Sequence, residues 1–207
     1  ALLRWPQPDG SLMPPGKFVP LAEELGLIHR IGGWVMREAC RQAKAWQQEG
    51  LGLAVSFNLS PRQLWNPGLA EEIITCIERE EVDPRRVIVE ITESAAMADP
   101  ARTQGALGAL SEAGVTVAID DFGTGHSSLS RLKLLPVDLL KIDLSFLREI
   151  PDNENATQMM AAIVQLAGAV TITTDDWIGR GFHGELIGFD DGHARSTGRW
   201  VWTDDRG

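Results

Sequence analysis

The sequence contains no long apolar run and comparatively little positive charge. None of its apolar stretches approaches the roughly 20 residues that a helix needs to cross a bilayer. Its first residues, ALLRWPQPDG, lack the basic region followed by an apolar one that marks a secretory signal. With 19 Lys and Arg against 29 Asp and Glu, the formal net charge is −10. We therefore expect a cytoplasmic chain with no membrane segment of its own, although a longer parent protein could be anchored. We expect no nucleic-acid polymer as a partner, because such partners require a basic face.

Cysteine is also scarce. The two cysteines, Cys40 and Cys76, fall in segments of helical pattern, and their spacing resembles neither a metal site nor a redox pair. We expect free, buried thiols, which suit a reducing cytoplasm. The chain has 207 residues, 43% of them hydrophobic and 23% charged, which predicts one globular domain with a sizeable core.

Strand-like and helix-like segments alternate along most of the chain. We predict strands over 2–5, 53–60, 86–94, 115–122 and 139–146. We predict helices over 18–28, 34–50, 61–82 with an interruption near Pro67, 103–114, 127–135 and 155–169. Ser60 suits the N-cap of the third helix, and Pro61 suits its first turn. This alternation indicates an α/β fold with a mainly parallel sheet covered by helices.

Polar residues stand at the carboxyl ends of four of the predicted strands: Asn58, Glu90, Asp120 with Asp121, and Lys141. In (β/α) barrels the functional site collects at this end of the strands, so the pattern favours a barrel over an open sheet. Two adjacent carboxylates are costly unless water, a cation or a metal faces them. The positions therefore predict a site on one rim.

The character of the sequence changes after about residue 170. The last segment contains no lysine and shows no amphipathic helical pattern. Because a complete barrel takes about 250 residues, we expect a partial barrel over 1–169, incomplete at its C-terminus, followed by an atypical tail over 170–207. In the tail, His183, Asp190, Asp191 and His193 could be interpreted as a metal-binding cluster, but we expect them to lie in a solvated loop.

Several long motifs carry a resemblance to a known family. They are ALLRW, PPGKFVPLAEELGLI, FNLSPRQL, VIVEITES and AIDDFGTGHSSLSRLKLLPVDLLKID, at matching spacings. With them the chain resembles the EAL domain, the bacterial phosphodiesterase module that hydrolyses cyclic di-GMP. The resemblance implies a modified TIM-type (β/α)8 barrel.

The resemblance also implies a role for each matching residue. Asn58, Glu90 and Asp120 resemble ligands of the catalytic Mg²⁺ or Mn²⁺ ions, and Asp121 resembles the ligand of a second metal. Lys141 resembles the lysine that contacts the catalytic water, and Glu93 resembles the residue that steadies the loop after DDFGTG. Arg4 resembles the arginine that contacts a substrate phosphate. Asp143 follows Lys141 in the same motif. Two metal ions activate a water and neutralise phosphoryl charge, so the implied product is linear pGpG.

Each residue also has a simpler interpretation. Asn58 could cap the helix that begins near Pro61, and Glu93 could cap a helix or pair locally. Asp143 could pair with Lys141, Arg4 could be solvated, and His126 is best explained as a loop residue. The chain departs from the family at two metal-binding glutamates. One of these glutamates would stand before Ala1. The other belongs to a motif similar to VVAEGVET, where this chain has VTITTDDWIG. Asp175 or Asp176 is a remote candidate to replace the second glutamate as a metal ligand. The QGY motif is missing too.

These departures leave a second function open, namely an inactive EAL-like module that binds cyclic di-GMP or a protein partner. The family further implies a possible homodimer and a companion GGDEF or sensor domain.

Overall fold

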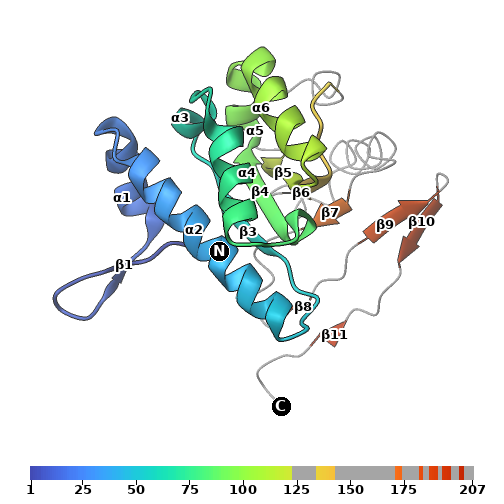
Figure 1. Ribbon diagram of the computed structural model, residues 1–207, viewed down its shortest axis with the longest axis horizontal. Coiled ribbons are helices and arrows are strands. Elements are labelled where there is room, and N and C mark those ends of the chain that lie inside the picture. Colours follow the sequence, from blue (N-terminus) through green and yellow to red (C-terminus); the bar gives the residue numbers. More distant parts are fainter. Residues whose placement is uncertain are drawn as a thin grey trace, which may run out of the picture. The chain divides into compact units, whose positions relative to one another are not determined.

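The computed structural model describes residues 1–122 and 134–142, together with the backbone of five short strands between 171 and 202 (Figure 1). The chain divides into two compact units. The first unit comprises Ala1–Ile91 and Asp99–Val117, and the second comprises Thr92–Ala98 and Ala118–Gly207.

The first unit opens with a small hairpin. Strand β1 (Trp5–Pro6) pairs antiparallel with β2 (Leu12–Met13). Gly10 has a φ of +82°, a left-handed conformation that favours glycine, and it allows the turn between the strands. The strand expected over 2–5 is therefore displaced to Trp5–Pro6, because the proline- and glycine-containing turn fixes where the chain pairs with itself.

Two helices follow the hairpin, α1 (Pro15–Glu24) and α2 (Ile28–Gln48). The buried residues of α2 recur with helical spacing and end at Cys40 and Ala43. This helix begins six residues earlier than the sequence predicted, since Gly32 and Gly33 lie inside it. Although α2 has 21 residues, no helix in the described part of the chain is long and apolar enough to cross a bilayer.

The centre of the first unit is a pair of parallel strands, β3 (Val55–Asn58) and β4 (Val87–Thr92), in which Val55 is opposite Val87 and Asn58 is opposite Glu90. Helices α3 (Pro61–Leu64) and α4 (Leu69–Arg79) and a 3₁₀ turn, η1 (Pro84–Arg86), connect the strands. The predicted interruption near Pro67 is confirmed by the break between α3 and α4. Helix α6 (Pro100–Glu112) packs beside α4, and α4 packs beside α2 (Figure 1).

The core of the first unit lies between these helices and the strands. Its fully buried side chains include Phe57, Ile73, Val87, Val89, Leu107 and Leu110. Because side chains alternate along a strand, this burial leaves the intervening positions, among them Asn58 and Glu90, on the opposite face.

The second unit contains helix α5 (Glu93–Ala98) and the last five residues of β5 (Thr116–Phe122). Strand β5 is parallel to β6 (Leu139–Ile142), which is parallel to β7 (Thr171–Thr173). Beyond β7 the pairing becomes antiparallel, through β9 (Ile187–Asp190) and β10 (His193–Ser196), while β8 (Phe182–His183) pairs with β11 (Val201–Trp202).

Glu93 and Ser94 were expected to end a strand, but they form the first turn of α5. The helix expected over 155–169 lies outside the described residues, as do 127–133 of the helix expected over 127–135 and 143–146 of the last predicted strand.

Candidate functional site

In the first unit, Asn58 and Glu90 stand side by side at the carboxyl ends of β3 and β4. They are register partners of a parallel pair, which places both side chains on the same face of the strands. Glu90 is 7% exposed, whereas Asn58 is exposed. The Leu59 amide donates to the Glu90 carbonyl at 2.8 Å, so the pairing continues one residue beyond Asn58. The predicted juxtaposition of these two residues is confirmed.

The chain turns into α3 immediately after Asn58. Ser60 is the N-cap, and its hydroxyl accepts a hydrogen bond from the Arg62 amide at 3.2 Å. The Gln63 side chain completes a capping box by accepting from the Ser60 amide at 3.1 Å. The capping role belongs to Ser60, so the simpler interpretation of Asn58 as the helix cap is wrong.

In the second unit, Asp120 and Lys141 form an ion pair. The Asp120 Oδ2 atom lies 3.2 Å from the Lys141 Nζ atom, and the two side chains are 16% and 7% exposed. The two residues come from adjacent parallel strands, β5 and β6. Of the adjacent carboxylates, Asp120 therefore faces a cation supplied by the chain itself, which reduces the cost of holding it beside Asp121.

The backbone at this position is irregular. The register between β5 and β6 shifts between Ile119 and Phe122, and Asp121 has a φ of +55°. The Asp121 amide donates to Asp120 Oδ1 at 2.9 Å. Irregular pairing of this kind turns a side chain away from the regular alternation, and a left-handed non-glycine residue stores strain that is concentrated at functional sites. The register shift and the left-handed backbone thus coincide at Asp121, directly after the ion-paired Asp120.

Two other predicted site residues lie elsewhere within their own units. Glu93 is 3% exposed and begins α5, where a carboxylate is favoured by the positive end of the helix. Arg4 is exposed, and its Nη1 atom donates to the Leu3 carbonyl at 2.8 Å. Asp143, His126, Asp175, Asp176 and Asp191 lie outside the described residues, and so does the loop that Glu93 is expected to steady.

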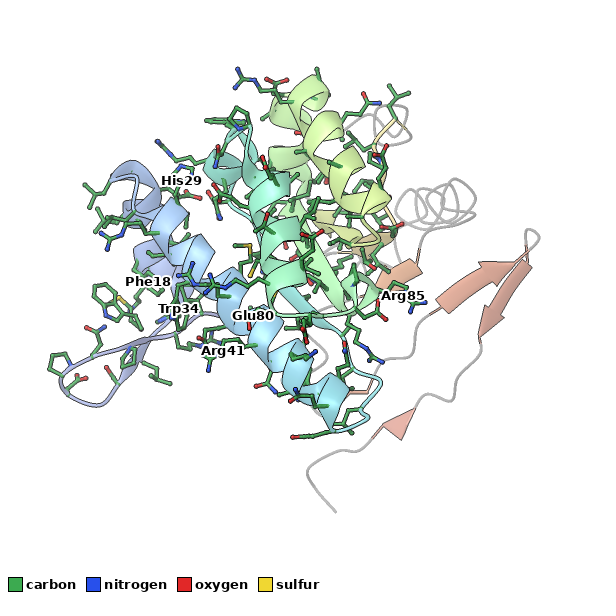
Figure 2. The ribbon with its side chains drawn as sticks, viewed as in Figure 1. Phe18, His29, Trp34, Arg41, Glu80 and Arg85 are labelled. Atoms are coloured by element: carbon green, nitrogen blue, oxygen red, sulfur yellow. The ribbon has the colours of Figure 1, made fainter. Side chains whose placement is uncertain are left out.

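Arg4 borders an apolar groove of about 570 Å³ formed by the N-terminal segment, α1 and α2. Phe18 and Trp34, both labelled in Figure 2, line it beside the hairpin. The rings of Trp5 and Phe18 meet edge to face, with centroids 5.5 Å apart. The structure thus places the Arg4 side chain against apolar residues rather than with Asn58 and Glu90.

The donors in the two units suit a hard divalent cation. Asn58, Glu90, Asp120 and Asp121 offer oxygen atoms only, which Mg²⁺ and Mn²⁺ prefer. Within the described residues, no group of three or more His, Cys, Asp and Glu side chains is close enough to hold a metal ion. The fit to these metals therefore rests on the chemistry of the donors.

The two cysteines are free and buried, as expected from the sequence. Burial raises the pKa of the Cys40 thiol to about 12, with a further contribution from Cys76. Burial also raises the pKa of Cys76, while its hydrogen bond with Cys40 lowers it. Both thiols lie in the packing between α2 and α4 and take no part in the sites above.

Sequence reasoning missed two residues that contact the turn after Asn58. Glu23, on α1, accepts a hydrogen bond from the Ser60 hydroxyl at 2.6 Å, and Gly32, on α2, lies against the Gln63 side chain. The capping box itself could have been recognised from the spacing of Ser60 and Gln63. The long-range contacts left no signal in the sequence.

Comparison with known proteins gives consistent matches. The EAL domain family model matches residues 1–174. The chain is 41% identical over 172 residues to the signaling protein YkoW of Bacillus subtilis, and 42% identical over 173 residues to MucR of Pseudomonas aeruginosa, a bifunctional diguanylate cyclase/cyclic di-GMP phosphodiesterase. Both alignments cover 83% of this chain, but only 22% and 25% of the relatives, so the chain spans about a quarter of their length or less.

A solved structure of the MucR phosphodiesterase in complex with cyclic di-GMP is similar, with 42% identity and a TM-score of 0.77. The match covers 84% of this chain and 72% of that one. Its fold and those of related EAL structures are TIM-type barrels, which confirms the predicted fold class. The rim pairs, the family match and these neighbours agree, and the chain belongs to the EAL domain family.

Proposed function

We propose that this chain is the cyclic di-GMP phosphodiesterase module of a longer signalling protein. The observation that carries the proposal is the arrangement at the strand ends, where Asn58 stands beside Glu90 and Lys141 is paired with Asp120. The resemblance of these positions to the family motifs supports the proposal. The similarity to MucR, whose name includes cyclic di-GMP phosphodiesterase, supports the same activity.

Each residue has a distinct role in this proposal. Asn58 and Glu90 in the first unit and Asp120 in the second would each supply an oxygen ligand to catalytic Mg²⁺ or Mn²⁺, and Asp121 would serve a second ion. When bound, such ions would lower the pKa of a water and neutralise charge on the phosphoryl oxygens. Lys141 holds the Asp120 carboxylate at 3.2 Å, and its ammonium would donate a hydrogen bond to the oxygen of the attacking water.

The reaction adds one water to one phosphodiester. The attacking water loses one proton to solvent as its oxygen bonds to phosphorus, the bond from phosphorus to the 3′ oxygen breaks, and the leaving oxygen takes up one proton from solvent, which gives linear pGpG. In the proposal Arg4 contacts a phosphate of the substrate through guanidinium N–H groups other than the one that donates to the Leu3 carbonyl. Glu93 and Asp143 are proposed as supporting residues of the same chemistry.

A second candidate function is binding without hydrolysis. It is favoured by the sequence VTITTDDWIG, which stands where the family carries a metal-binding glutamate. In this case the module would bind cyclic di-GMP and signal through a homodimer or a companion domain. MucR combines two activities in one protein, which supports a GGDEF companion for either candidate. The free thiols suit a cytoplasmic protein.

One experiment separates these candidates. The chain is incubated with cyclic di-GMP in Mg²⁺, in Mn²⁺ or in chelator, and both bound nucleotide and pGpG are measured by chromatography. The phosphodiesterase proposal predicts pGpG only when a divalent metal is present. Binding without pGpG would support the second candidate, and neither binding nor pGpG would contradict both.

A further inference from the structure

The turn that follows Asn58 is held by a chain of side-chain hydrogen bonds. The Ser60 hydroxyl donates to Glu23 Oε1 at 2.6 Å, and the Ser60 amide donates to Gln63 Oε1 at 3.1 Å. We call these three residues the Glu23–Ser60–Gln63 brace. It connects α1 to the start of α3, across 37 residues of sequence between Glu23 and Ser60.

The far end of the brace is fixed against α2. Gln63 is 5% exposed, and a Cβ atom placed on Gly32 would lie 2.0 Å from its Nε2 atom. No side chain larger than hydrogen fits at position 32 while Gln63 stays in place. Gly32 therefore provides the space into which the Gln63 amide packs, and the amide has little freedom to move.

The brace reaches Asn58 through Leu59. The Leu59 amide donates to the Glu90 carbonyl at 2.8 Å, and its side chain is 5% exposed. On the other side of Asn58, Phe57 is 1% exposed. The backbone of Asn58 is thus anchored by its neighbours in both directions while its side chain remains exposed. A neutral amide ligand gains less from Coulomb attraction than a carboxylate does, so its contribution depends more on being held in place.

We infer that Glu23 and Gln63 are positioning residues for Asn58, acting through Ser60 so that the Asn58 amide oxygen is presented beside Glu90 to a divalent cation. The inference rests on the proposed function in so far as Asn58 is a metal ligand. The geometry of the brace itself involves only residues of the first unit.

Amide hydrogen exchange of the metal-free chain tests the positioning directly. In Glu23→Ala the Leu59 amide should exchange about tenfold faster, because the turn loses its link to α1. In Glu23→Gln, which retains an acceptor for the Ser60 hydroxyl, its exchange should return close to the original rate. Lys44→Met is the matched control: it removes hydrogen bonds from Lys44 to Glu81 on another part of the unit and should leave Leu59 unchanged.

Binding of Mn²⁺, followed by calorimetry, tests the consequence. Glu23→Ala should bind Mn²⁺ about tenfold more weakly, with Glu23→Gln and Lys44→Met close to the original chain. The inference is overturned if Leu59 exchange is unchanged in Glu23→Ala, if Lys44→Met accelerates it equally, or if Mn²⁺ affinity is unaffected despite faster exchange. If the unaltered chain binds no Mn²⁺, the proposed function fails, and the exchange of Leu59 alone decides the inference.

Discussion

The two pairs of rim residues are held by different physical means. In the first unit, Asn58 and Glu90 are aligned by a regular parallel ladder, and the turn beyond them is fixed by the Glu23–Ser60–Gln63 brace. In the second unit, Asp120 is held by an ion pair with Lys141, next to a register shift.

This contrast separates two ways of presenting oxygen ligands. The ladder and the brace fix direction by hydrogen bonds, of which only the one to Glu23 involves a charged group. An ion pair fixes direction by attraction and stays stable only while both charges are present. Substitutions of charge should therefore affect the second unit most, and substitutions of shape should affect the first.

The largest effect is expected from Asp120→Asn. It removes the carboxylate that lies 3.2 Å from the ammonium of Lys141, whose side chain is 7% exposed. Loss of one partner of a buried pair costs about 3 kcal/mol, measurable as a fall in the free energy of unfolding in urea. The double variant Asp120→Asn/Lys141→Met should recover part of this loss, and purely additive effects would contradict the pairing. Asn58→Ala, at an exposed position of the first unit, should change the same quantity by less than about 0.5 kcal/mol.

An intermediate effect is expected from Gly32→Ala in the first unit. The new methyl group would meet the Gln63 amide at 2.0 Å, and such overpacking costs about 2 kcal/mol. Gly33→Ala is a matched control on the same helix, because its nearest neighbour is the Arg37 Nη1 atom at 3.5 Å. The control should stabilise the chain slightly, since alanine favours the helix by about 1 kcal/mol over glycine. Equal effects of the two substitutions on the free energy of unfolding would show that the Gln63 side chain can move away from position 32 at little cost.

The smallest effect concerns pH. Burial raises the pKa of Cys40 from 9.0 to about 12, so the unfolded chain loses this proton at lower pH than the folded chain does. The free energy of unfolding is then unaffected below pH 9 and falls as the pH rises from 9 toward 12. Between pH 8 and pH 10 we expect a loss of about 1 kcal/mol.

Urea unfolding at the two pH values measures this loss. Cys40→Ala should weaken the dependence, while a variant of the exposed Arg85 should leave it unchanged. An identical slope in Cys40→Ala would show that other groups cause it.

Much of the fold was predictable because its local signals are strong. Ser60, Pro61 and Pro67 marked the two helices after β3, and apolar strands marked the parallel pairs. The start of α2 was misplaced because Gly32 and Gly33 disfavour a helix when considered alone. The room that Gln63 needs beside Gly32 explains that glycine, but this contact between separate elements cannot be read locally.

The candidate site was predictable only as residue types at strand ends. Asn58 beside Glu90 follows from in-register parallel strands, and this was expected. The left-handed backbone of Asp121 and the reach of Glu23 to Ser60 were not expected, because both depend on how distant segments meet. The orientation of Arg4 against the Leu3 carbonyl also had no local signal.

The most direct test of the whole account is hydrolysis of cyclic di-GMP in Mn²⁺ by the unaltered chain and by Glu90→Gln. The substitution keeps the size of the side chain and removes the charge that a metal ligand needs. We expect the unaltered chain to form pGpG, and we expect Glu90→Gln to form it at least about a hundredfold more slowly, as for loss of a group acting in the transition state. Equal rates for the two proteins would contradict the assignment of this rim to metal-dependent hydrolysis.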